Sequence, residues 1–93
     1  MSKACSTQEI QKALEQLPGW EFEADALHKT WTFGDFRQSI AFLVRVAFEA
    51  EQAGHHPEIF NVYQRVKLTL RTHDVGNRVT QKDIDLANAI EQL

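Results

Sequence analysis

Four short strand-like segments, two on either side of one long helical segment, constrain the fold of this 93-residue chain more than any other feature. In all but the third of them apolar and polar residues alternate, and the four cover residues 20–25, 27–33, 59–63 and 66–73. A period of two is typical of strands with one buried face and one wet face. The brief connections at 24–26 and 64–65 predict that each pair of strands is an antiparallel hairpin.

Three further segments have helical spacing and a capping residue at their start. The first begins after Ser6 and ends before Pro18, the second covers residues 36–53 and ends at Gly54, and the third begins after Thr80. In the first and the third, an acidic residue follows the cap after three positions, which is the pattern of a capping box.

The resulting order, α-β-β-α-β-β-α, predicts one α+β domain over residues 1–93. Strands joined by tight turns pair antiparallel, so we expect a two-layer domain with a four-stranded antiparallel sheet and the three helices on one face. A chain of this length buries only about 60–65% of its unfolded surface. A lone subunit is then marginally stable, which favours self-association.

The long helix carries more apolar residues than one face can hold. We expect five of them to face the sheet: Phe36, Ile40, Leu43, Ala47 and Ala50. Phe42 and Val46 fall well away from this face and stay exposed unless another subunit covers them. The alternative is that they are tolerated as surface apolar residues.

Composition argues against several classes of protein. The net charge is -3 and neither half of the chain is basic, which argues against autonomous nucleic-acid binding. No run of 18 apolar residues is present, so the sequence predicts no membrane span. Cys5 is the only cysteine, which excludes an intrachain disulfide and favours a reducing, cytoplasmic location.

Three of the four histidines are expected to meet at one edge of the sheet. His55 and His56 follow the end of the long helix, and Pro57 forces an extended backbone directly after them. With a turn at residues 64–65, position 73 pairs roughly with position 56, which brings His73 close to both. The sequence has no glycine-rich phosphate loop and no paired-cysteine motif, so chemistry at this edge has to use imidazoles and carboxylates.

Three interpretations of this cluster stay open from spacing alone. Imidazoles exchange protons near neutral pH, which suits acid–base catalysis. They also bind metal ions, although adjacent histidines in an extended chain usually point apart. They can finally be ordinary polar residues at the ends of helices and strands. Glu51, about one helical turn before His55, either orients an imidazole or is a solvated glutamate.

Other candidate residues also have ordinary explanations. Asp83 fits its capping position without any further role. Trp20 is more typical of a core or an interface than of a ring-stacking platform. Lys67 and Arg71 share a strand face with His73, where they meet either an anionic ligand or water.

The residues around the histidine pair match a longer motif. Glu51 is followed after three residues by His55-His56-Pro57, by Tyr63 after five more, by His73 after another nine, and further on by Asp83. This pattern resembles the signature of the pterin-4a-carbinolamine dehydratases. The resemblance extends over essentially the whole chain, from the Gly19-Trp20 pair to the last helix.

The resemblance implies the fold predicted above, with dimers or tetramers formed through the sheet edge and the long helix. It implies loss of water from 4a-hydroxytetrahydrobiopterin, or a related 4a-hydroxytetrahydropterin, to give the quinonoid dihydropterin. This reaction recycles the cofactor of aromatic amino acid hydroxylases, so functional coupling to such a hydroxylase is implied as well. No cofactor or metal is implied, because moving protons at carbon 4a and nitrogen N5 involves no redox change.

The resemblance also assigns roles to individual residues. His55 and His73 are expected to transfer protons, and Glu51 to orient or tune a histidine. His56 is expected to bind the substrate and share base duty, in a substrate-binding site with Trp20, Pro57 and Asp83. The alternative function is non-catalytic: some family members are dimerisation cofactors of a homeodomain transcription factor, and the long-helix surface is then the binding surface. A metal-dependent hydrolase is a third candidate.

Overall fold

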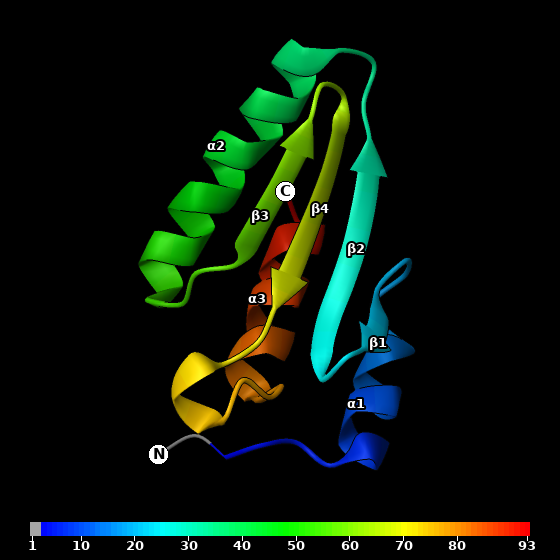
Figure 1. Ribbon diagram of the computed structural model, residues 1–93, viewed down its shortest axis with the longest axis vertical. Coiled ribbons are helices and arrows are strands. Elements are labelled where there is room, and N and C mark those ends of the chain that lie inside the picture. Colours follow the sequence, from blue (N-terminus) through cyan, green and yellow to red (C-terminus); the bar gives the residue numbers. More distant parts are fainter. Residues whose placement is uncertain (1–2) are drawn as a thin grey trace.

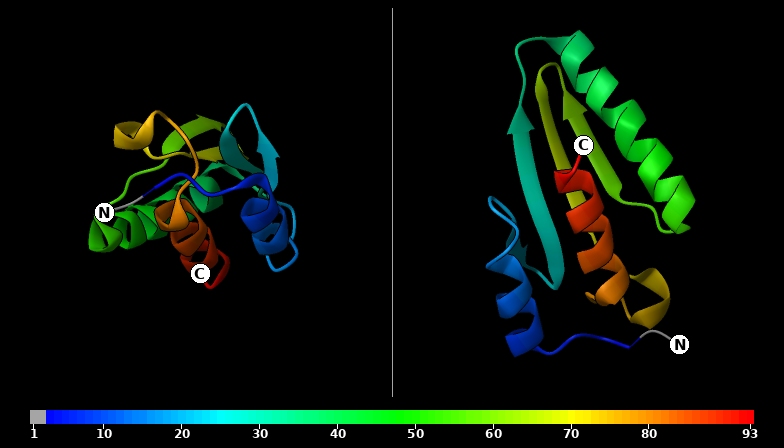
Figure 2. Two further views of the ribbon diagram at one scale, coloured as in Figure 1. Left: turned by 90° about the horizontal axis from the view of Figure 1, so that it is seen from below. Right: turned by 180° about the vertical axis from the view of Figure 1, so that it is seen from behind.

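The computed structural model describes residues 3–93 (Figure 1). Its elements, in chain order, are α1 (Thr7–Leu14), β1 (Glu21–Glu23), β2 (Ala26–Thr32), α2 (Phe36–Ala53), β3 (Glu58–Val62), β4 (Arg65–Leu70), the short 3-10 helix η1 (His73–Val75) and α3 (Gln81–Glu91). The strands form one antiparallel sheet in the order β1-β2-β4-β3. The three α-helices lie on one side of this sheet (Figure 2). The predicted α+β fold is confirmed.

Side-chain caps begin the helices where the sequence predicts them. Capping boxes start α1 at Ser6 and α3 at Thr80, and the Asp35 carboxylate accepts a hydrogen bond from the backbone at the start of α2. The predicted bounds of α2 are confirmed, whereas α1 ends at Leu14, earlier than the predicted stop at Pro18. Within residues 3–93, no helix combines the length and the hydropathy that crossing a bilayer requires.

The second hairpin turns one residue earlier than predicted. Val62 pairs with Arg65, so the turn is Tyr63-Gln64 and the pairing differs by two residues from the expected one. Tyr63 adopts a φ of +52°, which is uncommon for a residue other than glycine, asparagine or aspartate. The sequence therefore gave no turn signal there. Strand β4 ends at Leu70, and His73 begins η1 instead of closing a strand, which corrects its predicted place.

The core lies between the inner face of the sheet and the helices. The alternate residues Val66, Leu68 and Leu70 of β4 are completely buried, as the period of two predicts. They belong to one cluster of buried residues with the helix residues Val46, Ala50, Leu86, Ala87 and Ile90. Burial of each large aliphatic side chain in such a cluster contributes about 1.5–3 kcal/mol.

The predicted inner face of α2 is only partly right. Ala50 is buried in the core and Leu43 packs against it, as predicted, whereas Phe36, Ile40 and Ala47 are exposed. Val46 is completely buried and Phe42 is partly buried against the core, contrary to the prediction. Apolar residues cover most of this helix, so periodicity alone does not decide which face meets the sheet. The face that packs inward includes Ser39 and Ala50, whose small side chains allow a close approach of the helix. An exposed apolar surface on α2 is nevertheless present, made of other residues than expected.

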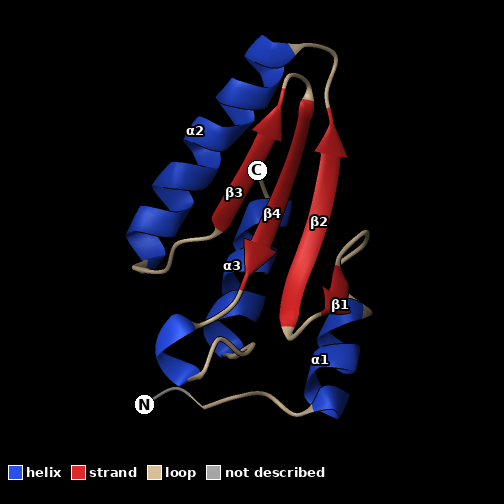
Figure 3. Cartoon of the chain, in the orientation of Figure 1, coloured by secondary structure: helices blue, strands red, loops and turns tan. Residues whose placement is uncertain are grey.

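The ends of several helices and strands, with their polar residues, lie together at one end of the sheet. There α2 ends, β3 begins and β4 runs on into η1 (Figures 1 and 3). This is the end of the molecule that holds the histidine pair and His73.

Candidate active site

The backbone of His55 is fixed by the way in which α2 ends. Gly54 has a φ of +64°, and its N–H donates to the carbonyl of Glu51 at 3.1 Å. The N–H of His55 reaches back to the carbonyl of Ala50, also at 3.1 Å. These two bonds form a Schellman motif, which glycine favours because it adopts the left-handed conformation without strain. The first histidine therefore leaves the helix in a defined direction.

The three histidines of the predicted cluster share one pocket. Its volume is about 260 Å³, and its lining residues are Gly54, His55, His56, Arg71, His73 and Asp74. This is close to the lower limit of roughly 300 Å³ that is usual for small-molecule sites. Three histidines, one arginine and one aspartate thus line one small volume.

His55 makes the shortest and most buried polar contact of the site. Its Nε2 lies 2.6 Å from Oδ1 of Asp83, with side-chain exposures of 11% and 0%. The other oxygen of Asp83 accepts hydrogen bonds from the hydroxyl of Thr72 at 2.8 Å and from the N–H of Thr80 at 2.9 Å. Because a carboxylate with three donors only accepts, Nε2 of His55 carries a proton. Among the hydrogen bonds of residues 3–93, Nδ1 of His55 takes part in none.

The other two histidines also contact carboxylates, but near the surface. Nε2 of His56 lies 3.0 Å from Glu51, and both side chains are mostly exposed. Nε2 of His73 lies 3.4 Å from Oε2 of Glu58. The same oxygen lies 2.9 Å from Nε of Arg71, whose N–H does not point along this line, so we regard the contact as ionic and not as a well-formed hydrogen bond. Exposed pairs of this kind hold their partners weakly, at about 0–1 kcal/mol.

The structure does not bring all the predicted site residues together. Trp20 is buried at the other end of α3, where its Nε1 donates to Glu91 at 3.0 Å. Neither Trp20 nor Pro57 is among the residues that line the histidine pocket. Asp83 is completely buried behind His55, with both oxygens engaged. Substrate contact by Trp20, Pro57 and Asp83 stays a prediction.

The fourth histidine has a structural explanation. Nε2 of His28 donates to the carbonyl of Glu23 at 2.9 Å, and its Nδ1 accepts from the hydroxyl of Thr69 at 3.0 Å. Both ring nitrogens are therefore engaged on the outer face of the sheet, and none of these three residues lines the histidine pocket.

Sequence reasoning missed three supporting residues. Glu58, the first residue of β3, contacts His73, and its only signal was its place directly after the His-His-Pro segment. Thr72 has no local signal, because it contacts Asp83 across eleven positions of the chain. Thr80 is predicted as a helix cap, but its contact with the Thr72 hydroxyl at 2.7 Å is not predictable from spacing.

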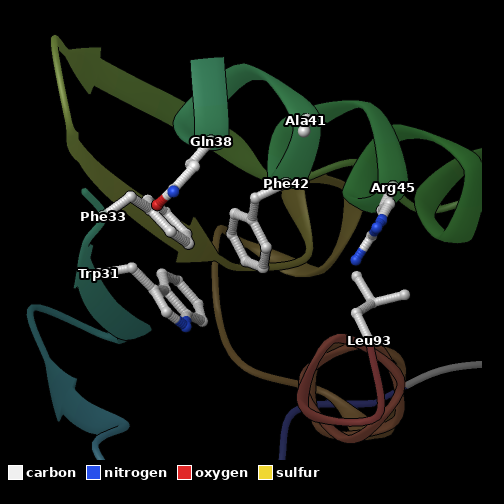
Figure 4. A pocket seen from close by; sticks show the side chains of 7 residues that line it. All are labelled: Trp31, Phe33, Gln38, Ala41, Phe42, Arg45 and Leu93. Carbon is white, nitrogen blue, oxygen red and sulfur yellow. The ribbon is translucent and has the colours of Figure 1, made fainter. Parts of the chain in front are cut away.

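A larger pocket of about 420 Å³ lies away from the histidines, between the sheet, α2 and the end of α3 (Figure 4). Its walls are the rings of Trp31, Phe33 and Phe42, with Gln38 and Arg45 as polar side chains. Neither of these polar groups exchanges protons near neutral pH. The smaller histidine pocket is therefore the better candidate for acid–base chemistry.

Nothing in the described part of the chain, residues 3–93, groups three histidine, cysteine, aspartate or glutamate side chains in a way that could hold a metal ion. The polar contacts give a reason. His55 and His56 direct their Nε2 atoms at two different carboxylates, Asp83 and Glu51, and so do not converge on one point.

Known proteins resemble this chain in sequence over nearly its full length. The family model of pterin 4 alpha carbinolamine dehydratase matches residues 3–93. A protein of Opitutus terrae with the provisional name pterin-4-alpha-carbinolamine dehydratase is 53% identical over 85 residues, which are 91% of this chain and 88% of that one. A protein of Thermosynechococcus vestitus with the same provisional name is 50% identical over 93 residues, 100% of this chain and 97% of its own.

Two solved structures share the fold. A protein of Brucella melitensis, described as a transcriptional coactivator/pterin dehydratase, has a TM-score of 0.89 and 36% identity over 96% of each chain. A pterin dehydratase-like protein, described as a RuBisCO assembly factor in the alpha-carboxysome, has a TM-score of 0.62 and 26% identity over 78% of this chain and 83% of that one. Relatives of this fold thus carry different functional descriptions. With a family model matching from residue 3 to residue 93 and relatives at 53% and 50% identity, the chain belongs to the pterin 4 alpha carbinolamine dehydratase family.

Proposed function

We propose that this protein is a dehydratase that removes water from 4a-hydroxytetrahydrobiopterin, or from a related 4a-hydroxytetrahydropterin, by histidine acid–base catalysis. The observation that carries the proposal is the buried His55–Asp83 contact beside a pocket that two further imidazoles line. A histidine whose Nε2–H is held by a carboxylate presents its Nδ1 lone pair as a base. The family to which the chain belongs supports the choice of substrate.

The proposed reaction needs one base and one acid. Nδ1 of His55 removes the proton from ring nitrogen N5, and the electron pair of the N5–H bond forms the N5=C4a double bond. The C4a–O bond breaks at the same time, and the leaving oxygen takes a proton from His73 to depart as water. The products are the quinonoid dihydropterin and water, and solvent returns the proton from His55 to His73. Positioned proton transfer of this kind contributes about 10²- to 10⁴-fold to a rate.

The surroundings of each histidine suggest its step. The side chain of His73 is 65% exposed and lies 3.4 Å from Glu58, so solvent can return a proton to it after each turnover, which suits the acid. His56, with Glu51 as its partner at the surface, suits substrate binding. Glu51 thus contacts a histidine, as expected of an orienting residue, although that histidine is His56 and not His55.

The test is dehydration of a 4a-hydroxytetrahydropterin generated by a hydroxylase, measured against the spontaneous rate in buffer. We expect His55→Ala to lower kcat by about 10²- to 10⁴-fold and His73→Ala to lower it by at least about tenfold. His56→Ala is expected to raise KM more than it lowers kcat. The matched control is His28→Gln, which removes an imidazole outside the pocket and should keep the wild-type rate.

Two outcomes contradict the proposal. A folded wild type that does no better than buffer is not a dehydratase for this substrate class. A wild type that loses its activity in a chelator uses a metal, and the imidazoles are then ligands and not proton carriers.

We also propose that the chain forms homodimers or homotetramers through the sheet edge and the long helix. An apolar stripe runs along α2 at intervals of four residues, formed by Phe36, Ile40, Val44 and Phe48, and Phe48 is 72% exposed. The edge strand β3 exposes Ile59, Phe60 and Val62, and Tyr63 in the turn that follows it is exposed as well. Exposed apolar stripes and unpaired strand edges are typical of protein–protein interfaces.

Analytical ultracentrifugation tests this proposal with one variant for each surface. Phe48→Glu places a charge in the α2 stripe, and Phe60→Lys places one on the strand at the edge of the sheet. We expect each variant to sediment as a smaller assembly than the wild type at concentrations near 100 μM, where roughly micromolar interfaces are occupied. A wild type that is monomeric under these conditions overturns the proposal.

A non-catalytic function is the second candidate, because the α2 stripe also suits a partner protein. The Brucella melitensis neighbour is described as a transcriptional coactivator as well as a dehydratase. The candidate predicts that a helical dimerisation peptide of a homeodomain protein binds the wild type and not Phe48→Glu, whether or not the protein dehydrates pterins. Calorimetric titration measures this binding, and no heat with the wild type rejects the candidate.

A further inference from the structure

We propose that Thr72 is a positioning residue for His55. Its hydroxyl holds the Asp83 carboxylate in the one arrangement that keeps the proton of His55 on Nε2 and leaves Nδ1 as the base. The inference rests on the proposed dehydratase function and adds a residue that neither touches the substrate nor lines the pocket.

The direction of every proton in this buried network follows from counting donors. Oδ2 of Asp83 accepts from the Thr72 hydroxyl at 2.8 Å and from the Thr80 N–H at 2.9 Å. A hydroxyl has a single proton, so Thr72 has none left for Thr80. The contact of 2.7 Å between the two hydroxyls is therefore donated by Thr80 to Thr72. Thr80 in turn accepts from the N–H of Lys82 at 3.3 Å.

Burial makes this arrangement rigid. Thr72 is 1% exposed, and both Thr80 and Asp83 are completely buried. Water does not reach these groups to replace a lost partner, so an unsatisfied donor or acceptor is costly. The two donors on Oδ2 fix the rotation of the carboxylate. Oδ1 is thereby held at 2.6 Å from Nε2 of His55.

Thr72 is a better test of this idea than the other members of the network. Thr80 and Asp83 also form the capping box of α3, so their removal weakens a helix. The side chain of Thr72 makes no capping bond to η1. Its neighbour along the chain is His73, so the same residue joins the buried pair to the proposed acid.

The experiment compares Thr72→Val, which removes only the hydroxyl, with Thr72→Ser, which keeps it. Thr69→Val is the matched control. Thr69 lies three residues earlier and is also buried, but its hydroxyl contacts His28 on the outer face, whereas the hydroxyl of Thr72 contacts Asp83. Each variant is assayed for kcat and KM, and the ring nitrogens of His55 are followed by 15N NMR. If Thr72→Val does not fold, Thr72→Cys takes its place, because a thiol is a weak donor of similar size to a hydroxyl.

The expected result has three parts. Thr72→Val lowers kcat about tenfold with KM within about twofold of the wild type, a loss that corresponds to about 1.4 kcal/mol. Its Nε2–H signal from His55 shifts and broadens. Thr72→Ser recovers most of the rate and the wild-type signal, and Thr69→Val changes neither.

Other outcomes overturn the inference. An unchanged kcat and an unchanged His55 signal in Thr72→Val show that the hydroxyl positions nothing. An equal loss of rate in Thr69→Val shows that general destabilisation is the cause. If the wild type lacks dehydratase activity, the proposed function fails, and the NMR comparison alone still decides whether Thr72 holds the His55 proton in place.

Discussion

Replacement of the buried carboxylate by its amide tests the chemistry of the site most directly. In Asp83→Asn the side chain keeps its shape, but one of its two ends becomes a donor. The three groups around it are also donors: Nε2–H of His55, the hydroxyl of Thr72 and the N–H of Thr80. Whichever way the amide turns, its NH2 group therefore faces another donor and finds no acceptor there.

The two orientations differ in energy. With the amide nitrogen toward Thr72 and Thr80, two buried donors lose their acceptor, which costs about 1–3 kcal/mol each. With the amide nitrogen toward His55, the capping bonds stay and the imidazole responds by moving its proton from Nε2 to Nδ1. The second orientation is favoured by roughly 2–6 kcal/mol. We expect a folded protein in which the atom proposed as the base is already protonated.

We expect Asp83→Asn to lose the whole contribution of the base to the catalytic rate. We expect kcat to fall by about 10²- to 10⁴-fold with little change in KM, in the way that amide substitution of the carboxylate in a Ser-His-Asp triad acts through the wrong tautomer. Stability should fall by at most about 2 kcal/mol, because hydrogen bonds to a charge become neutral ones while the cost of burying that charge disappears. Thermal unfolding measures this change separately from the rate.

The control is Asp85→Asn on the same helix. Asp85 is exposed and accepts a hydrogen bond from Gln81 at 2.8 Å, so its amide should leave the rate unchanged. The 15N spectrum of the His55 ring shows which nitrogen carries the proton. An Asp83→Asn protein that keeps wild-type kcat, or that keeps the proton of His55 on Nε2, refutes the assignment of Nδ1 as the base.

Three further predictions concern residues that take no part in the proposed proton transfers. A Cβ added in Gly54→Ala meets no atom within 4 Å, so the substitution costs only the strain of a left-handed backbone. We expect the free energy of unfolding in urea to fall by about 1–2 kcal/mol. An unchanged free energy of unfolding would show that the Schellman motif is dispensable. Hydrogen bonds from Ser6 lower the pKa of Glu9, so the charged carboxylate stabilises the folded state at neutral pH. The difference in Tm between the wild type and Glu9→Gln should therefore shrink as the pH falls below 4.5. A difference that grows at low pH would contradict this prediction. Burial, and then the charges of Glu9 and Asp83, raise the pKa of the Cys5 thiol above 9.0, so iodoacetamide should alkylate it more slowly at pH 8 than it alkylates free cysteine.

Local chemistry made much of the fold predictable. A cap at Ser6, Asp35 or Thr80 satisfies backbone groups within a few residues, so the start of each helix is predictable from the local sequence. The inner face of α2 depends instead on what packs against it, and two apolar faces of one helix look alike in sequence. The turn at Tyr63-Gln64 uses a left-handed tyrosine that no turn residue announces.

The same distinction applies to the site. The histidine cluster was accessible from spacing, because Gly54 and Pro57 confine the His55-His56 pair to a short junction. The partners of these histidines were not. The Thr72 contact spans eleven positions of the chain and the His55–Asp83 contact spans twenty-eight, so both exist only after α3 has docked on the sheet.

Asp83 links the proposed catalysis to folding in this chain. As the third residue of α3 it accepts the N–H of Thr80 and so completes the capping box that starts the helix. The same carboxylate fixes the imidazole of His55, at the end of a different helix. A helix start and a base partner impose different requirements, and only a carboxyl group with acceptors on both sides meets both. The place of Asp83 after His73 in the sequence motif is therefore explained by geometry. Helix α3 has to begin where its third residue, Asp83, reaches His55, which follows the end of α2.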